Sequence, residues 1–522
     1  MKKIFYFTIL VALMFLMGSC HRDRGNYDYY DMADVTVDAT SGIYTYNVVL
    51  GQLLNIPMTV AVAGISESEL SFQWEIQHAV ANNTFRIIEG KVSRDFDRTI
   101  GPDDYFDTYT TFRIRLVVSW EEKGRTRRAF SRLFEINASG ETGLLVLHGD
   151  DNSSDIAMII NNMFTVSAGT QVAQERIIFD MWSSANGGRI PGRGVMVQQQ
   201  RAWSIADSWI YVWTDQVQWH AAATNFVKLG SYEDLFFAED GVAFFQGRPE
   251  SIQIFGMERV IIDGGDLFWL TGASAHRFGV PQVFANLPDY RMSKHSYFNH
   301  LSAIGFCENR RAFVVISFGA GTPVAFRHST YGPFNLNDMQ ADLLHMDRGG
   351  IVTANQNFLA VFREDNGTKF IGEMRFDGGN APGDTWARFR YEVDGLPGFN
   401  EARFYALGGL SNTMNYYVTG ENSLYQFFVA GTSGIGAAQR LLMDGVPLEF
   451  TGEITMMKIL RPRLQTAATL YQFHGRKMLV GTYENGVGTL HAILLNELDG
   501  QALQRTKFTG FGRITDANLK PF

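Results

Sequence analysis

The segment Trp209-Ile-Tyr-Val-Trp213 decides the fold, because it is one copy of a pattern that returns along most of the chain. Each copy is a short run of aromatic and β-branched residues, the types that favour β-strands. A strand-like run precedes it, and a turn and a further strand follow it. The counterparts are Val260–Ile262, Ala312–Ile316, Phe358–Phe362, Asn415–Thr419 and Lys477–Gly481.

The preceding runs recur about every 50 residues, which is a repeat length typical of propeller blades. They are Gly143–Leu147, Ala202–Ile205, Ser251–Ile254, Ser302–Phe306, Gly350–Thr353, Phe404–Leu407 and Gly452–Thr455. Turns such as Asp263-Gly264-Gly265-Asp266 and Glu484-Asn485-Gly486 separate the later strands of a repeat. Residues 141–522 are therefore predicted to form a β-propeller of about seven blades. Six or eight blades also fit the spacing.

A second all-β region precedes the repeats. Leu70–Ile76 and Phe112–Trp120 alternate strictly between apolar and polar residues, so their apolar side chains share one face of a strand. Six or seven such short strands, with Trp74 in a central one, predict an Ig/PKD-like β-sandwich over residues 35–138. The cysteine pair of antibody domains is absent from the sequence, which excludes that subclass.

The first 20 residues have the pattern of a targeting segment rather than of a folded domain. Lys2 and Lys3 precede an apolar run, Ile4–Leu16, and then Met17-Gly-Ser-Cys20. This pattern resembles a bacterial lipobox, so residues 1–19 are expected to be a lipoprotein signal peptide and Cys20 the lipidation site. An ordinary signal peptide with a chance cysteine is the alternative. Residues 20–34 are expected to be a polar tether.

Three segments carry a further resemblance: Gly25-Asn-Tyr-Asp-Tyr29, Leu53–Pro57 and Phe72-Gln-Trp74. Their order and spacing resemble the PKD-like family of Bacteroidetes lipoproteins. The resemblance implies a lipid-anchored protein of the outer membrane, at the cell surface or on the periplasmic face. It also implies a SusC/SusD-type transporter complex as the partner, because such proteins are typically encoded beside SusC/SusD pairs.

Charge and cysteine content exclude other classes. The formal charge is −9 and the isoelectric point about 5.7, which argues against binding to nucleic acid. Loss of Lys2 and Lys3 with the signal would leave −9 − 2 = −11. The two cysteines, Cys20 and Cys307, cannot build a disulfide framework. Cys307 lies in an apolar run and is expected to be buried.

No catalytic motif is readable in the sequence, and no cofactor or metal is expected. The acidic stretch His148–Asp155 lacks the order of a calcium loop and is expected to be a hairpin turn. His295 and His300 are five residues apart, a spacing that fits no common metal motif, and are expected in a surface loop. Tyr211 and its strand neighbours are expected to pack between blades.

Four tryptophans near loops are candidates for stacking on a ligand: Trp182, Trp203, Trp219 and Trp386. Capping of blade edges is the alternative for all four. The expected function is that of a non-enzymatic accessory of a SusC/SusD-like nutrient uptake system, whose propeller binds a glycan, a peptide or the transporter. A propeller-fold polysaccharide hydrolase or lyase is the alternative, and would place two carboxylates in the central funnel. A purely structural spacer is a third reading.

Overall fold

The structure is a computed structural model of the chain. It describes residues 34–49, 53–78, 84–99, 111–139, 142–164, 175–200, 208–237, 245–255, 258–270, 277–284, 287–298, 302–317, 323–325, 332–349, 356–376, 387–408, 414–461 and 475–520. The chain divides into two compact units, and in the larger one the described residues from Ile136 onward are clustered together. In the described parts of both units, no helix is long and apolar enough to span a membrane.

The N-terminal unit is a β-sandwich. Its strands are β1 (Val35–Ala39), β2 (Thr45–Val49), β3 (Leu53–Ile56), β4 (Met58–Val62), β5 (Ser71–His78), β6 (Arg86–Ile87), β7 (Phe96–Thr99), β8 (Thr111–Glu122), β9 (Arg125–Phe130) and β10 (Phe134–Ser139). One sheet has the order β2-β10-β8-β5-β6, with β9 also paired to β8. The pairs β1-β4 and β3-β7 are separate. The described residues thus contain more strands than the six or seven predicted, because several are short edge pairs.

The alternation read from the sequence builds the sandwich core. Along β8 the alternate side chains from Phe112 to Trp120 are buried. Trp74 of β5 is fully buried, as predicted, and its ring lies 5.0 Å from that of Phe96 and 6.0 Å from that of Phe134. The indole N–H donates to the carbonyl of Ser93 at 3.1 Å. Trp74 therefore joins strands of different sheets without leaving its polar atom unpaired.

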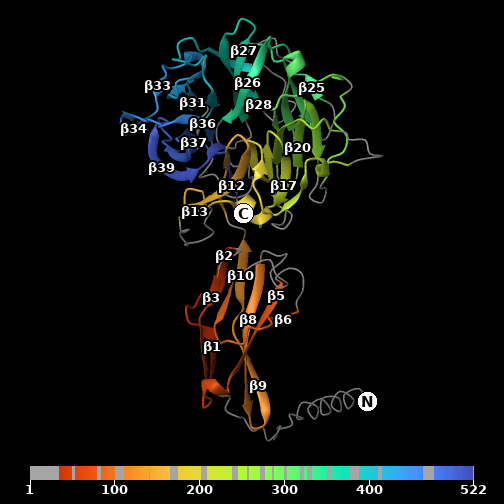
Figure 1. Cartoon of the computed structure of the whole chain (residues 1–522), viewed down its shortest axis with the longest axis vertical. Helices are drawn as coiled ribbons and strands as arrows, with labels where there is room; N and C mark the ends of the chain where they lie inside the picture. Colours follow the sequence, from red (N-terminus) through yellow and green to blue (C-terminus); the bar gives the residue numbers. More distant parts are fainter. Residues whose placement is uncertain are drawn as a thin grey trace, which may run out of the picture. The chain divides into compact units, whose positions relative to one another are not determined.

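The larger unit is built from seven sheets within the described residues (Figure 1). In chain order they are β40-β11-β12-β13 (Arg513–Lys520, Gly143–Gly149, Ser153–Ile160, Arg176–Ile178), with β14 (Ile190–Pro191) beside β12; β15 to β18 (Gly194–Gln200, Trp209–Thr214, Gln218–Ala222, Lys228–Ser231); β19 to β21 (Pro249–Phe255, Glu258–Asp263, Asp266–Leu270); β22 to β25 (Tyr297–Phe298, Ser302–Cys307, Ala312–Ser317, Pro323–Ala325); β26 to β29 (Ala341–Gly349, Gln356–Glu364, Lys369–Phe376, Ala387–Glu392); β30 to β33 (Phe404–Ala406, Met414–Val418, Leu424–Phe428, Gln439–Arg440); and β36 to β39 (Glu453–Ile459, Lys477–Glu484, Val487–Leu495, Ala502–Phe511), extended by β34 (Leu442–Met443) and β35 (Val446–Pro447). The α-helix α2 covers Met181–Asn186.

Hydrophobic clusters between successive sheets close these sheets into a ring. Each cluster of buried residues draws its members from two neighbouring sheets, and one cluster joins the last sheet, through Leu479 and Leu490, to the first, through Val146 and Ile159. The ring is also closed by hydrogen bonds, because C-terminal β40 pairs antiparallel with β11. The unit is therefore a seven-bladed propeller, in agreement with the predicted architecture.

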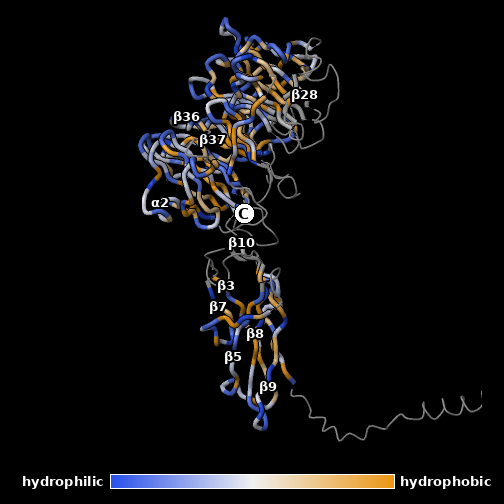
Figure 2. Tube along the Cα trace, turned by 90° about the vertical axis from the view of Figure 1, so that its right-hand side faces the viewer, coloured by the Kyte–Doolittle hydropathy of each residue, from blue (hydrophilic) through white to orange (hydrophobic). Residues whose placement is uncertain are grey.

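Apolar residues are concentrated in the strands and hydrophilic residues in the turns between them (Figure 2). Tyr211 and Trp213 of β16 are buried against Ile252 and Phe268 of the next blade, so the prediction that they fill the space between blades is confirmed. The hairpin β37–β38 turns at Asn485 and Gly486, which have φ of 50° and 84°. Two positive φ values favour the Asn-Gly pair found there.

Some predicted first strands are misplaced within their blades. Gly143–Leu147 and Ser302–Phe306 are second strands, because β40 and β22 take the inner positions of those sheets. The predicted runs Ala202–Ile205 and Gly350–Thr353 lie outside the described residues, and the inner strands of those blades are β15 and β26. The first blade is completed by β40 from the C-terminal end of the chain, and the sequence around Gly143–Leu147 does not indicate this pairing.

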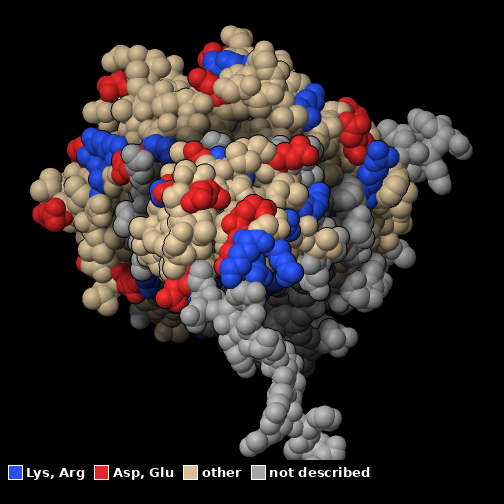
Figure 3. All heavy atoms as spheres, turned by 90° about the horizontal axis from the view of Figure 1, so that it is seen from below, with Lys and Arg blue, Asp and Glu red and all other residues tan. Residues whose placement is uncertain are grey.

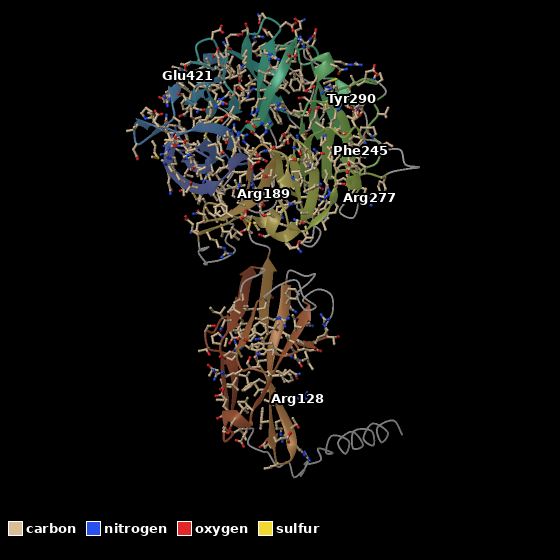
Figure 4. The ribbon with its side chains drawn as sticks, in the orientation of Figure 1. Arg128, Arg189, Phe245, Arg277, Tyr290 and Glu421 are labelled. Carbon is tan, nitrogen blue, oxygen red and sulfur yellow. The ribbon has the colours of Figure 1, made fainter. Side chains whose placement is uncertain are left out.

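The long connection between β21 and β22 is held by Tyr290 (Figure 4). Its hydroxyl accepts from the Leu267 N–H at 3.0 Å and donates to the Gln282 carbonyl at 2.8 Å. Its ring lies 4.9 Å from that of Phe284, which is buried in the cluster between the third and fourth blades. One side chain thus connects this segment to the preceding blade.

Candidate functional site

The inner strands of the blades converge on the axis of the propeller, where ligand sites of this architecture form. β40 lies against β15 and β36, the first strands of the two flanking blades. Polar side chains on these inner strands can therefore meet although they are far apart in the sequence. Two such clusters lie within the described residues.

The first is the His–Asp–Arg cluster, made by His295, His345, Asp347 and Arg461. His345 and Asp347 lie on β26, and their Nε2 and Oδ2 atoms are 2.7 Å apart. The other carboxylate oxygen of Asp347 lies 2.9 Å from Arg461 Nη1, just beyond β36. The ring of His295, just before β22, lies 5.8 Å from that of His345. Side chains from three blades thus meet at one place.

Backbone groups of a fourth blade complete this cluster. The Leu407 N–H donates to Asp347 Oδ2 at 2.9 Å. Arg461 donates to the carbonyls of Leu407 and Gly408. Asp347 and Arg461 therefore bridge the blades that contain β26, β30 and β36, and their positions are fixed by several bonds each.

The charge states follow from this environment. Burial acts to raise the pKa of Asp347, but the charges of His345 and Arg461 and its hydrogen bonds outweigh burial and lower that pKa. Burial, with the nearby charge of His345, lowers the pKa of His295 to about 3. Asp347 is therefore ionised and His295 neutral at pH 7.

His345 is the member of the cluster that can act on a ligand. Its Nε2 is occupied by Asp347, and its Nδ1 makes no hydrogen bond with another described residue. The side chain is 24% exposed. An imidazole oriented by a buried carboxylate can donate to a ligand or move a proton. The arrangement therefore suits recognition of a polar group, and equally acid–base chemistry.

The second cluster joins Lys458 of β36 to β40. Lys458 Nζ lies 3.0 Å from Asp516 Oδ1 and 2.9 Å from Asn518 Oδ1. Asp516 Oδ2 also accepts from the Val197 N–H of β15 at 3.0 Å, and Asn518 donates to the Val197 carbonyl at 2.6 Å. These bonds connect three inner strands around the closure of the ring, which gives the cluster a structural role.

Of the four candidate tryptophans, the structure describes Trp182 and Trp219. Trp182 was expected near the surface, but it is 1% exposed within α2, so it has no free ring face for a ligand. Asp155 holds α2 against the first blade, because its Oδ1 accepts the N–H groups of Trp182 and Ser183. The indole is then buried in the apolar cluster between the first and second blades. Trp203 and Trp386 lie outside the described residues, as does Cys20.

Trp219 is half-buried, and protein groups already engage its ring. It stacks on Trp182 with centroids 5.5 Å apart and planes 16° apart. Lys228 Nζ lies 3.8 Å from its centroid. Trp182 and Trp219, the two of the four candidates that lie within the described residues, thus pack on each other, as in the edge-capping alternative.

Most of the other candidates that the structure describes have the local roles expected of them. Asp150 accepts from the N–H groups of Asn152 and Ser153 at the β11–β12 turn, which confirms the predicted hairpin. Cys307 is buried. His300 lies outside the described residues, whereas His295 lies in a turn, as expected, but is half-buried beside His345. Within the described ranges, no group of three or more His, Cys, Asp or Glu side chains could hold a metal ion.

Sequence reasoning missed His345, Asp347 and Arg461. A signal for the first two exists, because His345-Met-Asp347 places both side chains on one face of a strand. Arg461 is more than a hundred residues away, and only the ring brings it to Asp347.

Comparisons with known proteins give no family. No family model matches the chain, and no curated protein matches it. The solved structures that resemble it include the N-terminal domain of Nup159, at 11% identity over 70% of this chain and 86% of that one, with a TM-score of 0.33. They also include the exotype rhamnogalacturonan lyase YesX, at 11% identity over 93% and 83%, with a TM-score of 0.28. A protein of unknown function from Dyadobacter fermentans matches at 8% identity over 77% and 92%, with a TM-score of 0.21. These scores are too low to carry an argument, so the propeller assignment rests on the sheets of this chain.

Proposed function

We propose that this protein is a lipid-anchored, non-enzymatic accessory of a SusC/SusD-like nutrient uptake system in the outer membrane. In this proposal Cys20 carries the lipid, the sandwich lies between the anchor and the propeller in the sequence, and the propeller binds a glycan or peptide ligand or the transporter. The targeting segment and the resemblance of Gly25–Tyr29 to PKD-like lipoproteins support the anchoring and the partner.

The observation that carries the binding role is the His–Asp–Arg cluster on the inner strands. Its carboxylate is satisfied within the cluster: Asp347 is bound by His345, Arg461 and a backbone N–H. The Nδ1 of His345 is then the polar atom of the cluster available to an incoming hydroxyl or amide. A site of this kind recognises a polar neutral group, such as a sugar hydroxyl, by a directed hydrogen bond.

The alternative is a propeller-fold polysaccharide hydrolase or lyase. One observation favours it: the 2.7 Å contact between His345 and Asp347, because a carboxylate-oriented imidazole is a common general base. Against it, the described carboxylates of Asp347 and Asp516 are each held by a cation and a backbone N–H, which leaves neither free to act as an acid or a nucleophile.

Anchoring and partner are tested together in the native host. Cys20→Ala should move the protein from the membrane fraction to the soluble fraction, and the wild-type protein should copurify with a TonB-dependent outer-membrane transporter. Membrane association that survives Cys20→Ala would contradict the anchoring. Wild-type protein that is lipidated but purifies alone would contradict the partner.

The ligand site is tested by screening glycans and peptides against the mature chain and then measuring the affinity of His345→Gln by calorimetry. The expected loss is about tenfold, the value of one hydrogen bond. Glu421→Gln, at the exposed β31–β32 turn on the same unit, is the control and should bind normally (Figure 4). Turnover of a polysaccharide by wild-type protein that His345→Gln abolishes would instead establish the enzymatic alternative.

A further inference from the structure

The β8–β9 hairpin of the sandwich carries excess positive charge in an acidic chain. The whole sequence has a formal charge of −9. The hairpin residues are Glu121, Glu122, Lys123, Arg125, Arg127 and Arg128, which sum to 4 − 2 = +2. Seen from this end of the unit, Lys and Arg side chains gather in one group with acidic side chains beside it (Figure 3). Local charge and overall charge are therefore opposite in sign.

Two of these arginines are not neutralised by the neighbouring acids. Glu122 pairs with Arg127, with Oε2 and Nε 3.2 Å apart, and Glu121 accepts from the Thr126 hydroxyl. The exposed side chains of Arg125 and Arg128 have no ion pair or hydrogen bond with another described residue. Arg128 lies on the hairpin, at the end of the sandwich where β9 is drawn (Figure 4). Its charge is therefore available to an anion.

Exposed apolar side chains lie at the end of β9, just after it, and on β1. Phe130 is 51% exposed, Leu133 44% and Val35 38%. Phe130, Val35 and Arg132 also line a cavity of about 420 Å³ between β1 and β9. Exposed aromatic and aliphatic groups beside arginines are typical of surfaces that lie at a lipid–water interface.

The position of the hairpin suits a membrane partner. The described chain begins at Asp34, next to β1, and the hairpin lies at the same end of the sandwich in both views (Figures 1 and 2). Residues 21–33, 13 in number, separate Asp34 from the proposed anchor at Cys20. Such a segment spans at most about 50 Å. The hairpin is therefore within reach of the surface that would hold the anchor.

We propose that the β8–β9 hairpin, through Arg125 and Arg128, docks on the phosphate headgroups of an anionic lipid surface. The membrane setting rests on the proposed anchoring at Cys20, whereas the docking itself needs no acyl chain. Docking would orient the sandwich on the membrane, since an acyl anchor alone leaves it free to rotate. An acidic protein partner and protection of the β9 edge by charge are the competing roles for these arginines.

The test uses the mature full chain with Cys20→Ala, so that lipidation plays no part. Its sedimentation with vesicles of phosphatidylglycerol and phosphatidylcholine is compared with that on phosphatidylcholine alone, at low and at high salt. Binding is expected only to the anionic vesicles and should fall with salt. The double variant Arg125→Gln, Arg128→Gln should bind roughly 20-fold more weakly, because each arginine near such a surface contributes about fivefold.

The control removes two exposed arginines from the propeller. Arg193→Gln, Arg277→Gln causes the same change of net charge and should bind like the parent. Equal binding by both double variants, or no binding of the parent to anionic vesicles, would overturn the proposal. Retention of the parent protein on immobilised polyglutamate but not on vesicles would indicate that the hairpin binds an acidic protein partner. Aggregation of the hairpin variant without a change in vesicle binding would show that the arginines protect the β9 edge from pairing with another chain. None of these results depends on whether Cys20 is lipidated.

Discussion

Acidification from pH 7 to pH 5 should weaken the closure of the propeller through His148. This residue lies at the end of β11, where the register with β40 shifts, and its Nδ1 accepts the Gly512 N–H at 3.1 Å. The ring is 5% exposed and packs edge-on to Phe511. Protonation of Nδ1 would place two N–H groups face to face across the closing strand pair.

The loss of folding stability can be calculated from the pKa of His148. Burial lowers the pKa of His148 from 6.5 to about 4, although the charge of Asp155 acts in the opposite direction. The unfolded chain therefore takes up the proton first, so the stability that neutral His148 contributes is complete above pH 6.5 and is lost as the pH falls towards 4. The loss between pH 7 and pH 5 is about 2 kcal/mol.

The assay is urea unfolding at pH 7 and pH 5, combined with hydrogen exchange of the amides in β11 and β40. His148→Asn is the matched variant, because its side-chain oxygen can accept from Gly512 and does not titrate. Burial also lowers the pKa of His220 to about 4 and that of His491 to about 3, so both proteins will lose some stability in acid. We expect the wild-type protein to lose about 2 kcal/mol more than the variant. Parallel losses would refute the reasoning.

Three further substitutions test the core and the closure by calorimetry. Trp74→Ala should destabilise the sandwich by about 3–5 kcal/mol, since it empties a fully buried indole site, whereas exposed Ile87→Ala should change its melting transition little. Asp516→Ala should destabilise the propeller by about 2–4 kcal/mol, because the Val197 N–H loses its acceptor and Lys458 loses its carboxylate partner. Asp516→Asn should recover part of this loss, and equal effects of the two variants would contradict the argument. Trp182→Ala should lower the melting temperature of the propeller and leave affinity for any ligand that the protein is found to bind unchanged, and a selective loss of affinity would restore the stacking hypothesis.

The positions of Trp182 and His295 could not be predicted from the sequence. Trp182 is expected near a loop and exposed, yet Asp155, 27 positions earlier, binds its backbone N–H, and its ring packs in the cluster between the first two blades. His295 lies in a turn, as its sequence context predicts, but the sequence does not show that this turn lies beside His345 of the next blade. In both cases the residue that sets the environment, Asp155 or His345, lies on a strand elsewhere in the sequence. The sequence pattern around Trp182 or His295 does not show that this strand is close in space.

The sequence by itself determined the architecture of this protein. Alternation in Phe112–Trp120 and the aromatic strands such as Trp209–Trp213 predict a sandwich and about seven blades, because strand periodicity and turn chemistry are local properties. Only the tertiary structure decided that β40 closes the first blade and that Arg461 meets Asp347. Both depend on bending seven sheets into a ring, and a ring brings together residues whose separation along the chain carries no information about their distance.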